Sequence, residues 1–204
     1  MRLRRRTLNI ISFIGLFNIT LLVGCSTTSS VISQPDGATQ APAAQSAESV
    51  KHWEMDGAMA AKSDSKGWSA SFYWTQQGLD NYIIRLFGPL GNGTTVISHK
   101  HGVTTFQKGQ ETASSGNAEQ LLHEKTGVHF PVTDLYYWAR CLPAPSSKST
   151  LTRDANHHVV QIQQAGFTVE CTQYTRIQQV DLPEHIKVTG PHVSLKIIIK
   201  NWKL

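Results

Sequence analysis

The sequence is poor in the residues and motifs that mark several common classes of protein. Only three of its 204 residues are cysteines, and no acidic or cysteine partner stands at HExxH or CxxC spacing. Charged residues make up 16% of the chain, which is low for a coiled coil, whereas 40% apolar residues are too many for a disordered chain. A GxSxG nucleophile elbow, a phosphate-binding loop and a dinucleotide-binding fingerprint are also missing. We therefore expect no catalytic residue, no metal site and no cofactor.

The positive charge of the chain is concentrated at its N-terminus. The formal net charge is +5, but Arg2, Arg4, Arg5 and Arg6 lie in a segment of 24 residues that contains no acidic residue. The rest of the chain contains fifteen basic and fourteen acidic residues, so it is nearly neutral. This distribution argues against a nucleic-acid-binding domain.

The N-terminus has the pattern of a signal peptide. Residues 8–23 form an apolar run, which is shorter than the roughly 20 residues that a membrane-spanning helix needs. The run ends in Leu22-Val23-Gly24-Cys25, which resembles the lipobox of bacterial lipoproteins. The resemblance implies cleavage after Gly24, an S-diacylglycerol on Cys25 and an acyl chain on its new amino group. An ordinary secretory signal with a chance cysteine is the alternative.

The acylated N-terminus is expected to anchor the protein to the outer membrane. One acyl chain gives only marginal anchoring, whereas three hold a protein on a bilayer essentially irreversibly. Ser26 rather than an aspartate follows Cys25, and bacterial lipoproteins of this kind usually go to the outer membrane. Residues 26–49 are rich in small and polar residues, as in a flexible tether. We thus expect a signal peptide at 1–24, an acylated N-terminus with a tether at 25–49, and one folded domain at 50–204.

From about Trp53 onward the sequence has the pattern of an antiparallel β protein. Residues 68–74 alternate between apolar and small or polar side chains, which places Trp68, Ala70, Phe72 and Trp74 on one face. Other segments bounded by Gly, Pro or Asn predict further strands at 81–87, 94–99, 103–108, 159–164, 167–174, 184–189 and 193–202. An Asn cap and a preceding proline predict helices at 117–125 and 132–139.

This order of elements predicts a mainly β (α+β) fold. We expect a single, strongly curved antiparallel sheet that forms an incomplete barrel and is covered by a few helices. The alternation brings aromatic and aliphatic side chains onto the concave face, where they form either a packed core or the wall of a ligand cavity. The pattern alone favours the packed core.

Two cysteines remain once Cys25 is acylated. Outside the cytoplasm an even number of cysteines favours a disulfide, here between Cys141 and Cys171. Two isolated thiols are the alternative.

The connection Phe87–Gly93 carries an apolar residue where polar turn residues are usual. Leu90 stands between Pro89 and Gly91. On a protein anchored to a membrane, an exposed leucine at this point would contact lipid. The alternative is that Leu90 folds back onto the sheet.

Short motifs rich in Gly, Pro and aromatic residues are spread along most of the mature chain. They are the lipobox ending at Cys25, Trp53 with Asp56-Gly57-Ala58-Met59-Ala60, Trp68-x-Ala70-x-Phe72-x-Trp74, Tyr82-Ile83-Ile84-Arg85-Leu86, Gly88-Pro89-Leu90-Gly91, Leu121-Leu122 before Gly127, Pro131-Val132, Trp138-Ala139-Arg140 with Leu142-Pro143, Phe167-x-Val169 with Tyr174, Leu182-Pro183, and a terminal strand ending at Trp202. No single motif is diagnostic. In order and spacing, the set resembles the LolB family of outer-membrane lipoproteins.

The resemblance implies a fold and a function. The fold would be an open, strongly bent antiparallel sheet covered by helices, with an apolar cavity for acyl chains. The function would be that of a monomeric receptor on the periplasmic face of the outer membrane, which takes acylated lipoprotein cargo from a LolA-like carrier and inserts it into outer-membrane lipid without ATP. Leu90 with Pro89 would form the membrane-contact loop, and the cavity would be lined by Trp68, Phe72, Trp74, Ile84, Leu86 and Trp138.

Two features of the chain depart from this family. Cys141 stands where the family typically has glycine, and Cys171 also lies outside the family pattern, so the resemblance does not support the disulfide. The alternative function is a structural lipoprotein that scaffolds an envelope complex around a packed core. A lipid carrier without a LolA-like partner lies between the two.

Overall fold

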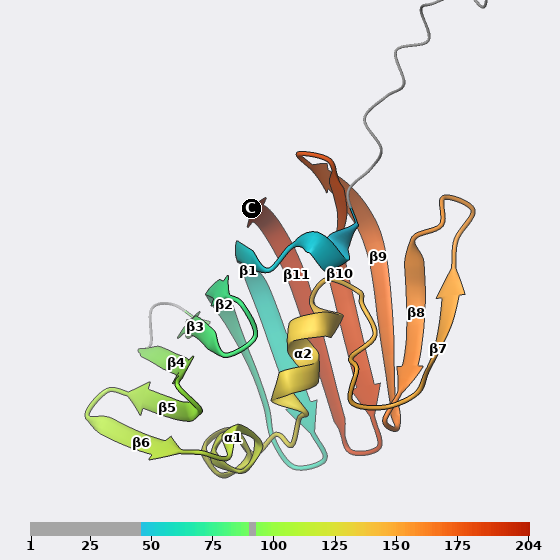
Figure 1. Cartoon of the computed structure of the whole chain (residues 1–204). Helices are drawn as coiled ribbons and strands as arrows, with labels where there is room; N and C mark the ends of the chain where they lie inside the picture. The colour runs from blue at the N-terminus through green and yellow to red at the C-terminus, as the bar shows by residue number, and fades with distance from the viewer. Residues whose placement is uncertain (1–45, 90–92) are drawn as a thin grey trace, which may run out of the picture. The chain divides into compact units, whose positions relative to one another are not determined.

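The computed structural model describes residues 46–89 and 93–204, which form a bent antiparallel sheet with helices on one face (Figure 1). The predicted signal peptide, Cys25, Ser26 and Leu90 lie outside the described residues. The elements in chain order are η1 (Ala47–Ser49), β1 (His52–Ser63), β2 (Gly67–Gln77), β3 (Asn81–Phe87), β4 (Thr94–Lys100), β5 (Val103–Lys108), β6 (Glu111–Ser115), α1 (Ala118–Thr126), α2 (Val132–Trp138), β7 (Ser149–Arg153), β8 (Val159–Gln164), β9 (Phe167–Ile177), β10 (Val180–Gly190) and β11 (Val193–Lys203). No described helix is long and apolar enough to cross a membrane.

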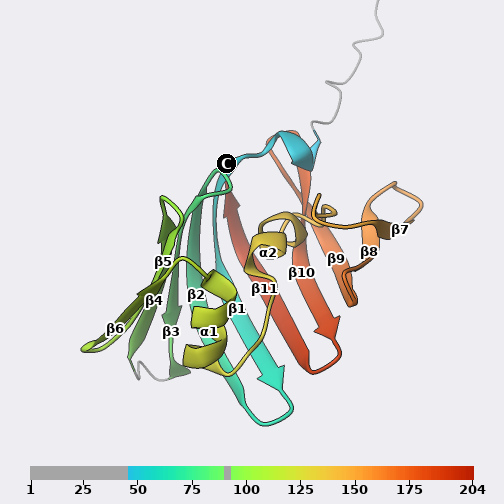
Figure 2. The same cartoon turned by 60° about the horizontal axis from the view of Figure 1, so that its bottom comes forward.

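All the strands belong to one sheet in the order β6-β5-β4-β3-β2-β1-β11-β10-β9-β8-β7, and neighbouring strands are antiparallel. The pairing of β1 with β11 joins the beginning of the domain to its end, with Glu54 opposite Lys203. The sheet bends but does not close, and β6 and β7 lie at its opposite ends (Figures 1 and 2). The predicted open, curved antiparallel sheet is therefore confirmed.

Every strand predicted from the sequence lies within an observed strand, but three observed strands were not predicted: β1, β6 and β7. The central strand β1 contains the small residues Gly57, Ala58, Ala60 and Ala61, which have low intrinsic strand propensity. Its stability comes from pairing along both edges, with β2 and with β11. A sequence pattern based on branched and aromatic residues cannot detect such a strand.

Gly57 permits the close pairing of β1 with β11. The register between these two strands shifts at Asp56 and Gly57, which marks a β-bulge. A Cβ atom at position 57 would overlap the backbone carbonyl of Ile198. The Asp56-Gly57 motif thus allows the two backbones to approach at the bulge.

The two helices cover the concave face of the sheet (Figures 1 and 2). The Asn117 side chain caps α1 by accepting a hydrogen bond from the Gln120 backbone N–H at 3.0 Å. The helix ends at Gly127, whose φ of +75° is the left-handed conformation of a glycine C-cap. The helix α2 follows Pro131. Both helices were predicted from these terminal residues.

Arg140 ties the N-terminal end of the domain to α2. Its side chain is 2% exposed, and the guanidinium donates hydrogen bonds to the backbone carbonyls of Ala47, Val50 and Tyr136. The guanidinium also lies over the Tyr136 ring, 4.2 Å from its centroid. Burial lowers the pKa of Arg140. Residues 47–49, which were assigned to the tether, thus form a short 3-10 turn held against the folded domain.

The structure joins Cys141 and Cys171 in a disulfide, with their Cα atoms 6.3 Å apart. This bond links the turn after α2 to β9. Cys141 has a φ of +56°, a left-handed conformation that favours glycine. A glycine would adopt this backbone conformation without steric cost.

Reduction of this disulfide is expected to destabilise the domain. The bond closes a loop with a sequence separation of 30 residues, so its loss should lower the free energy of unfolding by about 2–4 kcal/mol. Urea unfolding of the non-acylated protein with and without reductant measures the change. The double variant Cys141→Ser, Cys171→Ser should match the reduced protein and should not respond to reductant. Equal unfolding midpoints for the oxidised and reduced protein would contradict the expectation.

Candidate functional site: an apolar cavity between the sheet and the helices

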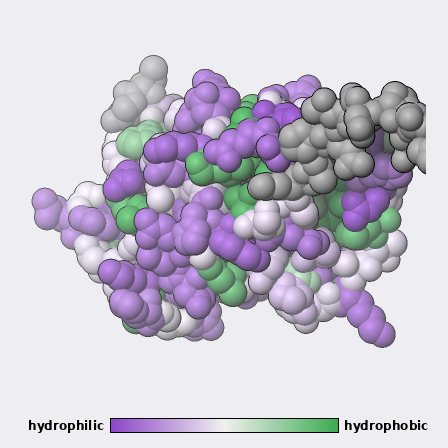
Figure 3. Space-filling view, turned by 45° about the horizontal axis from the view of Figure 1, so that its top comes forward, coloured by the Kyte–Doolittle hydropathy of each residue, from purple (hydrophilic) through white to green (hydrophobic). Residues whose placement is uncertain are grey.

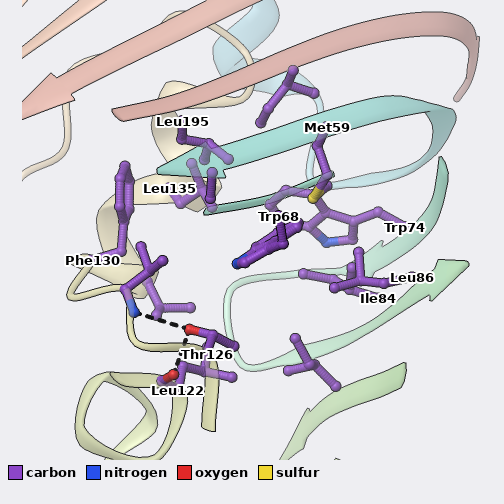
Figure 4. Close-up of a pocket in the computed structure, with 15 residues that line it drawn as sticks. Met59, Trp68, Trp74, Ile84, Leu86, Leu122, Thr126, Phe130, Leu135 and Leu195 are labelled. Carbon is purple, nitrogen blue, oxygen red and sulfur yellow. Dashed lines mark hydrogen bonds between the residues drawn. The ribbon is translucent and has the colours of Figure 1, made fainter. Parts of the chain in front are cut away.

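An apolar cavity lies between the concave face of the sheet and the helices α1 and α2 (Figure 4). Side chains from β1, β2, β3, β4 and β11 form one side, and α1, α2 and the segment between them form the other. The lining residues are Met59, Ala61, Trp68, Trp74, Ile84, Leu86, Ile97, Leu122, Thr126, Val128, Phe130, Val132, Leu135, Leu195 and Ile197. We refer to this space as the cavity.

Cross-strand pairing assembles the sheet side of the cavity. One row of paired residues runs from Trp74 through Ile84 to Ile97. A second row places Ala61 between Trp68 and Leu195. Residues directly opposite each other on paired strands present their side chains on the same face, so each row points inward together. The small Ala61 side chain between two large ones leaves space at this point of the wall.

Helical spacing assembles the covering side. Leu122 and Thr126 are four residues apart on α1, and Val132 and Leu135 are three apart on α2, so each pair shares one helix face. The Thr126 hydroxyl donates to the Leu122 carbonyl at 2.6 Å and accepts from the Val128 backbone N–H at 3.3 Å (Figure 4). This polar group is therefore already satisfied within the protein.

The cavity is large enough for part of an apolar ligand. The volume of the cavity is about 90 Å³, whereas a single water needs roughly 10–15 Å³. On the outer surface shown in Figure 3, hydrophobic residues form separate areas between hydrophilic ones. The cavity lining, by contrast, consists of apolar side chains apart from the Thr126 hydroxyl and the two indole N–H groups.

Four of the six predicted wall residues line the cavity: Trp68, Trp74, Ile84 and Leu86. The other two, Phe72 and Trp138, are not among the residues that line it. Phe72 is 2% exposed and belongs to the packed core beside the cavity. Trp138 is fully buried in an aromatic cluster, 6.3 Å from the Phe130 ring and 5.4 Å from the Phe167 ring. Its indole N–H donates to Gln164 at 3.1 Å, which fixes its orientation in the core.

The remaining wall residues were not identified from the sequence. Those on the sheet are Met59, Ala61, Ile97, Leu195 and Ile197, and those on the covering side are Leu122, Thr126, Val128, Phe130, Val132 and Leu135. The alternation along residues 193–202 could have identified Leu195 and Ile197, and the helical spacing of Val132 and Leu135 could have identified those two residues. Residues of the undetected strand β1 had no such signal.

Three buried polar atoms have no hydrogen-bond partner among the described residues: Trp53 Nε1, Trp68 Nε1 and Tyr82 Oη. Burial raises the pKa of Tyr82 to about 12. Tyr82 lies at a neighbouring, more polar hollow rather than in the cavity. Of the three groups, Trp68 alone lines the cavity.

Two of the histidines, His99 and His158, make contacts within the fold. The His99 ring stacks on Tyr82 with centroids 5.3 Å apart, and the His158 ring stacks on Tyr174 at 4.3 Å. Both ring nitrogens of His158 also lie 3.3 Å from a carboxylate, one of Asp154 and one of Asp181. Within residues 46–89 and 93–204, no group of three or more His, Cys, Asp or Glu side chains could hold a metal ion.

Comparison with known proteins places this geometry in a family. The family model described as outer membrane lipoprotein LolB matches residues 51–202. The chain is 33% identical over 196 residues to the outer-membrane lipoprotein LolB of Pseudomonas aeruginosa PAO1, covering 94% of this chain and 95% of that protein. It is also 33% identical over 194 residues to the outer-membrane lipoprotein LolB of Pseudomonas fluorescens Pf-5, covering 93% and 94%.

Solved structures show a likeness of fold. The crystal structure of a DUF1329 family protein from Desulfovibrio piger superimposes with a TM-score of 0.53 and 9% sequence identity. The match covers 77% of this chain and 87% of that one. The bent sheet with covering helices is thus found in proteins with little sequence similarity.

Filling the cavity should prevent an apolar ligand from binding. Ala61→Phe places a ring between Trp68 and Leu195, so N-phenyl-1-naphthylamine should bind at least about tenfold more weakly, a difference of roughly 1.4 kcal/mol. Fluorescence titration measures the affinity. Ala60→Phe is the matched control, because Ala60 is exposed on the opposite face of the same strand. Equal affinities for the two variants would show that the fluorophore binds outside the cavity.

Proposed function

The chain belongs to the family of the outer membrane lipoprotein LolB, and we propose that it takes lipoproteins from a periplasmic LolA-like carrier and inserts them into the outer membrane. It is an outer-membrane lipoprotein that acts in lipoprotein localisation. The observation that supports the proposed transfer is the apolar cavity beneath α1 and α2. We propose no enzymatic activity, since the sequence carries none of the catalytic motifs considered above.

The membrane anchor in this proposal is Cys25, modified with an N-acyl chain and an S-diacylglycerol. The sequence Leu22-Val23-Gly24-Cys25 supports this modification, and Ser26 supports sorting to the outer membrane. The tether then begins at the membrane, and Arg140 holds its last residues against α2 through the carbonyl of Ala47, at 3.2 Å. The domain acts as a monomer on the periplasmic face.

The free energy for transfer comes from the acyl chains themselves. Exposing a buried methylene group to water costs about 0.8 kcal/mol, so releasing a cargo's chains into the periplasm would cost tens of kcal/mol. Direct passage from carrier to receptor avoids this exposure. The cavity must bind the chains more tightly than the carrier does and less tightly than the bilayer. The cargo then moves downhill without ATP.

Loading of the cavity requires a change in its cover. The observed space accommodates only part of a long acyl chain. Leu122 on α1 and Leu135 on α2 form the covering wall, so cargo entry displaces one or both helices. Because the disulfide and Arg140 hold the end of α2, the segment from α1 to Phe130 is the part that moves in this proposal.

The connection between β3 and β4 is the proposed membrane-contact loop. Phe87 is 40% exposed at its start, and Pro89 is exposed beside it. Phe87 and Pro89 also border a hollow on the outer face of the sheet together with Ile198, which is 47% exposed. These exposed apolar residues support Leu90 as the residue that enters the bilayer. Burial of one leucine contributes roughly 1.5–3 kcal/mol, enough to bring the loop onto lipid.

A scaffolding lipoprotein is the alternative function. It would need a packed interior, because its role requires a surface for partners rather than an internal binding space. The cavity with its apolar lining favours the transfer function over the scaffold.

A transfer assay tests the proposed function. Protein comprising residues 26–204, without the acylated cysteine, is mixed with a LolA-like carrier loaded with a labelled lipoprotein and then with liposomes. The label is expected to pass from the carrier to this protein and on to the liposomes. Failure of a folded protein to capture label from a competent carrier would support the scaffold instead.

Leu90→Glu is expected to leave capture of the cargo intact and to impair its insertion. A charged side chain in the contact loop opposes entry into the bilayer, so the rate of label transfer to liposomes should fall about tenfold or more. Leu151→Glu is the matched control, since Leu151 is exposed on β7 at the other end of the sheet from the loop. Insertion at the same rate by both variants and the unsubstituted protein would exclude Leu90 from membrane contact.

A further inference from the structure

The indole N–H of Trp68 is a buried hydrogen-bond donor without a partner among the described residues. Three of the other four tryptophans have satisfied N–H groups: Trp74 donates to Gln76 at 2.8 Å, Trp138 to Gln164 at 3.1 Å and Trp202 to the Pro183 carbonyl at 3.0 Å. The fourth, Trp53, is also unpaired. Buried polar groups in folded proteins nearly always find a partner, because an unmade hydrogen bond is destabilising. The unpaired donor at Trp68 therefore calls for an acceptor that the protein itself does not supply.

The position of Trp68 makes a ligand the source of that acceptor. Trp68 lines the cavity, and the nitrogen side of its ring is turned toward Phe130 and the α1 residues Leu122 and Thr126 (Figure 4). The other lining residues with N–H or O–H groups are Trp74 and Thr126, and both already make hydrogen bonds within the protein. Among the side chains that line the cavity, the Trp68 N–H is thus the one donor without a partner among the described residues.

A water molecule fits this site poorly. An internal water is retained when it makes about three hydrogen bonds and needs at least two polar partners. The lining offers only the Trp68 N–H as a free group, so a water there would keep its own two donors unpaired. An acceptor that brings no donor of its own matches the site better.

We propose that Trp68 Nε1 donates a hydrogen bond to an acyl carbonyl oxygen of the lipid that occupies the cavity. This proposal rests on the proposed function, in which the cargo is an acylated lipoprotein. Such a lipid carries carbonyls in ester linkage on its glycerol and in amide linkage on its amino group. An ester carbonyl accepts without donating, whereas a carboxylate would bring an unpaired charge into an apolar space. The contact fixes the carbonyl end of one chain at Trp68 and directs its hydrocarbon along the apolar wall.

Isosteric replacement of the donor tests this contact. Site-specific incorporation of 3-benzothienylalanine at Trp68 exchanges the N–H for sulfur and keeps the bicyclic ring. Displacement of N-phenyl-1-naphthylamine then gives the affinities of methyl laurate, N-methyllauramide and an alkane of matched length. Removing the donor should weaken the binding of methyl laurate about three- to tenfold relative to the binding of the alkane. If the affinity for N-methyllauramide falls as much as that for methyl laurate, Trp68 can bind the carbonyl of either linkage. If only the affinity for methyl laurate falls, the contact is with the glycerol esters.

Replacement of Trp53 by the same analogue is the control. Its Nε1 is also buried and unpaired, but Trp53 does not line the cavity, so the affinity ratio should not change. Thermal unfolding of each variant verifies that the fold is retained, and Trp68→Phe provides a second variant in which the ester-to-alkane ratio must fall as well. An unchanged ratio in both Trp68 variants, with normal binding of the alkane, would overturn the carbonyl contact and leave the proposed function standing. Failure of the unsubstituted protein to bind any of the probes would overturn both.

Discussion

The pairing of β1 with β2 on one edge and with β11 on the other is the constraint on which the cavity depends. This register places Ala61 between Trp68 and Leu195 and sets Met59 opposite Ile197. Because strand side chains alternate between faces, a shift by one residue would turn each inward residue outward. Gly57 allows the backbones to approach at the bulge where the register shifts. The same pairing brings the beginning and the end of the domain together, so the cavity wall combines residues distant in sequence.

A space lined by apolar groups lowers stability, because its walls lose contacts that a packed core would make. The structure retains such a space beneath two helices that are held against the sheet by different contacts. The disulfide and the buried Arg140 hold the end of α2, and the Trp138 cluster anchors that helix in the core. The helix α1 instead lies over β5 and β6, toward one end of the sheet. This asymmetry suits a receptor whose fixed wall binds acyl chains and whose other side admits and releases them.

The sequence allowed most of the fold to be predicted, because alternation along strands and capping at helix ends are local signals. Residues 68–74 show the inward face directly, and Asn117 and Gly127 mark the ends of α1. The strand β1 was not predictable from the same signals, since its small residues are stabilised by neighbours far along the chain. Periodicity also indicates that Phe72 and Trp138 are buried, but it does not show which buried residues line the cavity and which do not. That distinction depends on the placement of helices over the sheet, which is a tertiary property.

The most direct measurement of the central claim is photo-crosslinking of a lipoprotein cargo during transfer. A benzophenone amino acid is placed at Leu135, in the covering wall of the cavity, or at Leu151, which is exposed on β7 at the end of the sheet away from the contact loop. Illumination while labelled cargo passes through the protein should give an adduct at position 135, joined through an acyl chain, and little at position 151. Equal crosslinking at the two positions, or adducts at position 151 alone, would contradict the claim that acyl chains occupy the cavity.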